Sequence, residues 1–98
     1  MPKRTDKNQV EIVETLRRMG VSVAVTSGVG CGFPDLVIGG VMPCMCGSGR
    51  RIRQTKIVEV KTASGILTPD QEEFHATWRG QLDIARSPDE VLRVTGSL

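Results

Sequence analysis

Breaks rich in glycine and proline divide this chain of 98 residues into short segments, and that division limits its possible folds more than any other feature. The glycines and prolines fall between periodic apolar stretches and form no repeat. A chain of this length has room for one hydrophobic core. The sequence therefore predicts a single domain, residues 1–98, assembled from short helices and strands.

Residues 6–19 have the pattern of an amphipathic helix. Asp6 is a candidate N-cap, Gln9 is its capping-box partner, and Gly20 marks the end of the helix. At about 100° per residue, Gln9 projects toward the apolar side of this helix and Glu11 projects away from it. The apolar side consists of Val10, Ile12, Val13, Leu16 and Met19.

Strand-like and helix-like segments follow in an order that predicts an α/β fold. Thr68, Pro69 and Gln71 form a strong helix start, and this helix is expected to end near Gly80. The order is helix, three strands, helix, strand, helix, which indicates a mixed sheet. The expected strands are residues 21–26, 36–39, 52–62 and 82–86, with breaks at 27–32 and 40–51 and a short last helix starting at 87–90.

The third expected strand carries a charged pair. Side chains alternate along a strand, so Glu59 and Lys61 project to one side while Val58 and Val60 project toward a core. Asp35 reaches the same place if the second and third strands pair as a hairpin whose loop is the segment rich in glycine and cysteine. In most proteins this pattern is an ordinary exposed pair on an edge strand, so the pair alone is weak support for a site.

Two carboxylates that converge on one point repel each other, and a hard divalent cation such as Mg²⁺ or Mn²⁺ relieves that repulsion. Asp35 and Glu59 are the candidate ligands, with the backbone carbonyl of Val60 as a third. A cation there would activate a water for attack on phosphorus, and Lys61 would either stabilise the charge that develops in the transition state or position that water. The pattern therefore favours hydrolysis of a phosphodiester.

The basic residues are unevenly distributed, although the net charge is only +2. Clusters of this kind contact phosphates in many nucleic-acid-binding proteins, and in others they form a solvated surface. The candidate phosphate contacts are Arg17, Arg18, Arg50, Arg51, Arg53 and Lys56, and Lys3, Arg4 and Lys7 form a further group at the start of the chain.

Three motifs in sequence order resemble the VRR-Nuc family of the PD-(D/E)XK nuclease superfamily, and in particular its stand-alone phage and bacterial members. The motifs are GFPDLV at 32–37, VEVKT at 58–62 and LTPDQ at 67–71, and the resemblance extends from about residue 8 to residue 86. It implies a restriction-endonuclease-like core with a central mixed sheet flanked by helices. It further implies a homodimer that cleaves DNA with Mg²⁺ or Mn²⁺, with branched or Holliday-junction-like DNA as substrate.

The resemblance also assigns roles to individual residues. It implies that Asp35 and Glu59 are metal ligands and that Lys61 is the catalytic lysine. Gln71 matches the glutamine that starts the helix after the E-x-K strand, while its capping-box position offers a purely structural alternative.

One position departs from the family pattern. The family usually carries a glutamate on the first helix, eleven positions before the glycine that ends it, and this chain has Gln9 there. A neutral amide holds a metal-bound water but adds no negative charge. Glu11 is the alternative acid if the helix is rotated. This departure motivates a rival interpretation, a catalytically weak or inactive nucleic-acid-binding module with the same fold.

Three cysteines and one histidine remain. Cys44 and Cys46, with Cys31 and His75, invite a zinc interpretation, but C-x-C is not the usual spacing of structural zinc sites, and a loop insertion is favoured. His75 is expected to be exposed and is assigned no role. Phe74 and Trp78 lie four residues apart on the second long helix and are expected to form core or dimer contacts.

The composition predicts a soluble protein. Apolar residues make up 39% of the chain and charged residues 24%. No apolar run approaches the roughly 18 residues of a membrane span, and the start of the chain leads into polar sequence. We therefore expect a cytoplasmic protein with no membrane partner.

Overall fold

The computed structural model describes residues 7–44 and 46–96, and the proposed N-cap Asp6 and the basic residues Lys3 and Arg4 lie outside that range. The predicted order of helices and strands is confirmed. The elements are α1 (Lys7–Arg18), β1 (Ser22–Val25), β2 (Leu36–Pro43), β3 (Arg51–Val60), α2 (Pro69–Thr77), β4 (Leu82–Ala85) and α3 (Pro88–Val94).

The four strands form one mixed sheet in the order β1-β2-β3-β4. β1, β2 and β3 are antiparallel neighbours, and β4 pairs parallel to β3 after the crossover through α2. β3 therefore lies between two strands. The alternative in which Glu59 sits on an edge strand is wrong for that reason.

The hairpin of β2 and β3 is longer than predicted. The expected break at 40–51 is wrong for residues 40–43, because β2 continues to Pro43 and only residues 44–50 separate the two strands. Glycine weakens a strand locally, but Met42 is fully buried in the core and holds this part of β2 in place. At the other ends, β3 stops at Val60 and α2 at Thr77, both slightly earlier than expected.

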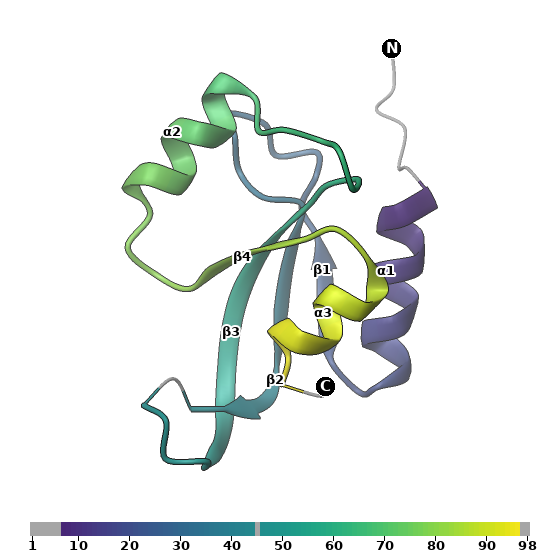
Figure 1. Cartoon of the computed structure of the whole chain (residues 1–98), viewed down its shortest axis with the longest axis vertical. Coiled ribbons are helices and arrows are strands. Elements are labelled where there is room, and N and C mark those ends of the chain that lie inside the picture. Colours follow the sequence, from purple (N-terminus) through teal and green to yellow (C-terminus); the bar gives the residue numbers. More distant parts are fainter. Residues whose placement is uncertain (1–6, 45, 97–98) are drawn as a thin grey trace.

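Two helices cover one face of the sheet. α1 and α3 contact each other and pack on the same side, whereas α2 lies apart from them (Figure 1). Gln9 faces inward with only 5% exposure and Glu11 is exposed, as the helical projection predicts. The core between these helices and the sheet contains Ile12, Val13, Leu16, Leu36, Ile38, Met42, Val58, Val60, Ala85 and Val91.

The second long helix, α2, packs loosely on the opposite face. Within Pro69–Thr77, all of which the structure describes, no residue is buried. A complete capping box fixes its start: Thr68 Oγ1 accepts from the Gln71 amide, and the Gln71 side chain accepts from the Thr68 amide. None of the helices in the described part of the chain has the length and apolarity needed to cross a membrane.

Candidate active site

Asp35 and Glu59 face each other across the hairpin. Leu36 pairs with Val58, so the same antiparallel register continued by one residue places Asp35 opposite Glu59. The Val60 N–H donates to Asp35 Oδ2 at 2.9 Å, which ties the carboxylate to the strand that carries the E-x-K triplet. The hairpin geometry on which the sequence argument depends is present.

The chain around Asp35 is held from the β1 side as well. The Thr26 N–H donates to the Asp35 carbonyl at 2.7 Å, and Thr26 Oγ1 donates to the Pro34 carbonyl at 2.8 Å. Pro34 is buried. Asp35 therefore sits at a fixed point where the glycine-rich loop enters β2.

Glu59 is fully buried, with 0% exposure, although it points away from the core residues Val58 and Val60. α2 covers it: Gln71 Nε2 donates to Glu59 Oε2 at 3.4 Å, and His75 Nε2 lies 3.3 Å from Glu59 Oε1. A buried carboxylate is costly unless it has polar partners, and these two side chains supply them. The interpretation of Glu59 as part of an exposed surface pair is wrong.

Gln71 caps α2 and also contacts Glu59. Its Oε1 accepts from the Thr68 N–H at 2.9 Å and closes the capping box, while its Nε2 donates to Glu59. A side-chain amide carries both an acceptor and donors, so one residue can cap the helix and hold the carboxylate.

The expectation that His75 is exposed is wrong. Its side chain keeps only 14% exposure and contacts Glu59. Burial, and secondarily the positive charge of Lys61, lowers the pKa of His75 below its ordinary value of 6.5. The tautomer with its proton on Nε2 is the one that can donate to Glu59 Oε1 across this 3.3 Å contact. The available signal was spacing, because His75 lies one helical turn beyond Gln71 on the same face.

Lys61 follows β3 directly. Its N–H donates to the Ala85 carbonyl at 3.1 Å, so the backbone still runs along β4 at this position. Its carbonyl accepts from Asn8 Nδ2 at 2.8 Å, which ties the start of α1 to the end of β3. Its positive charge contributes to the lowered pKa of His75.

The glycine-rich loop before Asp35 docks against the start of α2. Gly32 has a φ of +81°, and a Cβ added there would collide with the Asp70 backbone carbonyl. The Phe33 and Phe74 rings meet edge to face with centroids 5.4 Å apart, and Phe74 stacks on Trp78 at 5.3 Å. Phe74 is half-buried and Trp78 is 44% exposed, so the aromatic pair packs on this loop and lies outside the main core.

The two candidate residues of α1 lie in different surroundings. Gln9 lines a shallow groove with Val25, whose strand partner Leu36 follows Asp35. Glu11 is exposed and lines another groove with Asn8 and Thr62. Gln9 therefore belongs to the interface between helix and sheet, and Glu11 belongs to the surface beside the end of β3.

The prediction that Lys56 contacts phosphate is wrong. Lys56 is only 7% exposed, its Nζ donates to the Val94 carbonyl at 2.9 Å, and it lies 3.9 Å from Asp83. It shares the face of Val58 and Val60, so it anchors α3 and presents no charge to a ligand. The five arginines predicted to contact phosphate are all exposed: Arg17, Arg18, Arg50, Arg51 and Arg53.

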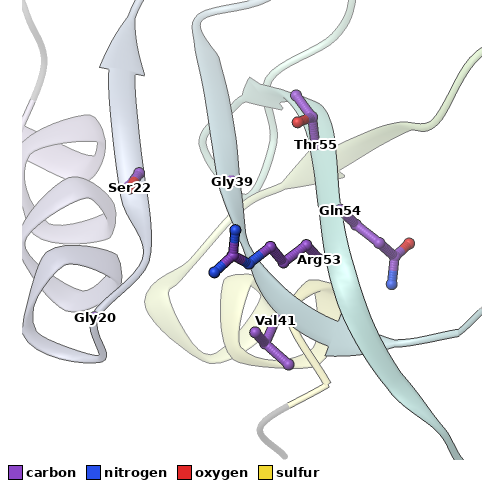
Figure 2. Close-up of a pocket in the computed structure, with 8 residues that line it drawn as sticks. Gly20, Ser22, Gly39, Val41, Arg53, Gln54 and Thr55 are labelled. Atoms are coloured by element: carbon purple, nitrogen blue, oxygen red, sulfur yellow. The ribbon is translucent and has the colours of Figure 1, made fainter.

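A shallow groove runs over the sheet face that carries Glu59. Figure 2 shows Arg53 reaching across β2 toward β1, whereas Gln54 points away. Ser22, Gly39 and Thr55 give the groove a floor of small side chains. Arg53 shares the face of Glu59 because both are odd-numbered positions of one strand.

The donor set around Asp35 suits a hard cation. Among the described residues, no three His, Cys, Asp or Glu side chains gather as a metal-binding group, so the four candidate zinc ligands do not meet. Mg²⁺ needs only one or two carboxylates when water and substrate phosphate complete its shell, and the opposed Asp35 and Glu59 supply two. Comparisons of the chain with known protein families, with curated proteins and with solved structures found no match.

Proposed function

We propose that this protein is a metal-dependent endonuclease that hydrolyses DNA phosphodiester bonds. The observation that carries the proposal is the link of Asp35 Oδ2 to the Val60 N–H at 2.9 Å, which joins one carboxylate to the strand holding Glu59 and Lys61. Asp35 and Glu59 then lie opposite each other on paired strands, and Lys61 follows on the same chain segment as Glu59. The order and directions of the elements support a restriction-endonuclease-like core, as the resemblance to the VRR-Nuc family implies.

Each residue of the site has a distinct part in this function. Asp35, Glu59 and the Val60 carbonyl would hold Mg²⁺ or Mn²⁺, which supplies an acidified water and offsets charge on the phosphate. Gln71 and His75 hold the buried Glu59 carboxylate in one orientation. Lys61 contributes positive charge where negative charge develops on the phosphate oxygens. Gln9 extends the site from α1 as a neutral hydrogen-bonding group.

The substrate proposed is branched or Holliday-junction-like DNA, bound by a homodimer. One chain of 98 residues offers little surface for a duplex. Two copies related by a two-fold axis would present two grooves and two sites, which matches the symmetry of a four-way junction.

Cleavage of a labelled four-way junction and of linear duplex, with Mg²⁺, Mn²⁺ or EDTA, tests the activity. Asp35→Asn, Glu59→Gln and Lys61→Met should each lower the cleavage rate by about 100-fold or more while DNA binding persists. Glu73→Gln alters an exposed charge outside the site and serves as a matched control. Equal cleavage by the site variants and the wild type would rule out the assigned residues.

A non-catalytic DNA-binding module is the second candidate, and Gln9 in place of an acid is the observation that favours it. The same gels distinguish the two functions. Retarded junction DNA that stays intact with every metal tested would establish the binding module. The variant Gln9→Glu then shows whether a third negative charge restores cleavage.

A further inference from the structure

Two cysteines that the proposed active site does not use lie in contact at the far end of the hairpin. The loop between β2 and β3 is at the opposite end of the sheet from α2 (Figure 1). Cys44 Sγ and Cys46 Sγ are 2.6 Å apart, and both are free thiols. The Cys46 N–H also donates to Cys44 Sγ at 3.3 Å. Backbone and side-chain contacts therefore hold the two sulfur atoms together.

The surroundings of Cys46 favour its ionised form. Its Sγ lies 3.0 Å from Ser48 Oγ, and the side chain is exposed to solvent. The hydrogen bond from Cys44, followed by those from Ser48, lowers the pKa of Cys46 to about 7. A thiol whose pKa lies close to the ambient pH combines a large thiolate fraction with high nucleophilicity.

Access supports the same chemistry. Cys46 is exposed, and the neighbouring Arg50 at the end of the loop is exposed as well, so solvent and small molecules can reach the sulfur. The loop is closed by the Cys44 N–H, which donates to the Arg50 carbonyl at 2.7 Å. A low-pKa, accessible thiol beside a second thiol is the arrangement of a redox-active pair.

We propose that Cys46 and Cys44 form a reactive dithiol that small-molecule disulfides oxidise to a disulfide within the loop. The Cys46 thiolate attacks one sulfur of the disulfide, a mixed disulfide forms on Cys46, and one thiolate leaves. Cys44 then loses its proton and attacks Cys46 Sγ, and the second thiolate leaves. The protein loses two electrons and two protons, and the small-molecule disulfide is reduced to two thiols.

Reaction of the reduced protein with glutathione disulfide, followed by intact mass, tests the order of these steps. The wild type should lose the mass of two hydrogen atoms and retain no glutathione. Cys44→Ser should stop at a stable glutathione adduct on Cys46, because the second step is blocked. Cys46→Ser should react more slowly than the wild type, since the attacking thiolate is absent.

Cys31 supplies the matched control, because it is exposed but has no neighbouring thiol. Cys31→Ser should behave as the wild type does. The rate for the wild type should rise with a midpoint near pH 7, and the midpoint for Cys44→Ala, which has no side-chain donor at that position, should move higher because the first stabilising hydrogen bond is gone. A wild type that accumulates adducts, reacts first at Cys31 or forms only links between chains would overturn the proposal.

Discussion

Glu59 shows how a single buried charge organises its neighbours. The carboxylate is fully buried, yet it points away from the apolar core and toward α2. Gln71 and His75 approach it from one face of that helix. Because no residue of α2 is buried, these polar contacts are a large part of the contacts between α2 and the sheet.

His75 gives the stability of the protein a predictable dependence on pH. Its pKa is lowered in the folded state, first by burial and then by the positive charge of Lys61. As the pH falls through 6.5, the unfolded chain therefore takes up the proton first, and the free energy of unfolding decreases. Above pH 6.5 this loss is absent.

Urea unfolding of the wild type and His75→Asn at pH 7.5 and pH 5.5 tests the sign of this dependence. Asparagine cannot titrate, so the variant should lose less stability than the wild type between the two pH values. Equal losses in both proteins would mean that His75 titrates alike in the folded and unfolded states.

Lys56 illustrates a basic residue whose role is structural. Its ammonium group donates to the carbonyl of Val94 at the end of α3 and is almost fully buried. Lys56→Met keeps the length of the side chain but leaves that carbonyl without its donor. We expect a loss of about 1–3 kcal/mol in the free energy of unfolding, with little change in DNA binding. Arg53→Met, on the exposed face of the same strand, should change stability by less than about 0.5 kcal/mol.

The glycine-rich loop and α2 depend on each other for their positions. Gly32 has a positive φ and leaves space for the Asp70 carbonyl, while Gly30 has a similar φ of +84° and open space around it. A comparison of substitutions at the two glycines therefore distinguishes the effect of backbone strain from the effect of steric contact. Gly32 is the residue at which the loop contacts α2, the helix that covers Glu59.

Gly32→Ala should destabilise the protein by more than Gly30→Ala does. Both substitutions carry the strain of a left-handed backbone, about 1–3 kcal/mol, but only Gly32→Ala forces the loop and α2 apart. Trp78 is the only tryptophan and stacks on Phe74, so its fluorescence reports the docking of α2. A changed emission in Gly32→Ala alone, together with slower cleavage, is the expected result. The same emission in both variants would contradict this coupling.

The order of the elements was predictable because their signals are local. Thr68 with Gln71, and Ser87 ahead of α3, are caps that a few neighbouring residues determine. The extension of β2 was not predictable from residues 39–43, since Met42 is held there by contacts distant in sequence. Alternation along β3 would have placed Lys56 on the core side with Val58.

The site was predictable in part for the same reason. Asp35 and Glu59 meet because the hairpin register continues to the loop, and the sequence suggested that hairpin. The contact of His75 with Glu59 was missed because α2 has no apolar stripe. A helical projection of its sequence therefore does not predict which side of the helix faces the sheet. Only the docked loop decides which side of α2 meets the sheet.

At the level of the whole domain, the two faces of the sheet are unequal. α1 and α3 lie on one side of the sheet and α2 lies apart from them (Figure 1), where its Gln71 and His75 contact Glu59. The groove floored by Gly39 and Thr55 lies on the same face as Glu59, and Arg53 lines it. A DNA strand bound at Asp35 and Glu59 would therefore extend over Arg53 and would leave the arginines at the end of α1 aside.

Salt dependence of DNA binding distinguishes these two groups of arginines. Each phosphate contact contributes a slope of about 0.9 in the logarithm of affinity against the logarithm of salt concentration for duplex DNA. Arg53→Ala should therefore reduce the slope by about one contact and weaken binding at low salt. Arg18→Ala, an exposed arginine at the end of α1, should leave the slope unchanged. The reverse result would indicate that DNA binds along α1 and not in the groove, because the salt dependence reports which charged side chains lie against the phosphates.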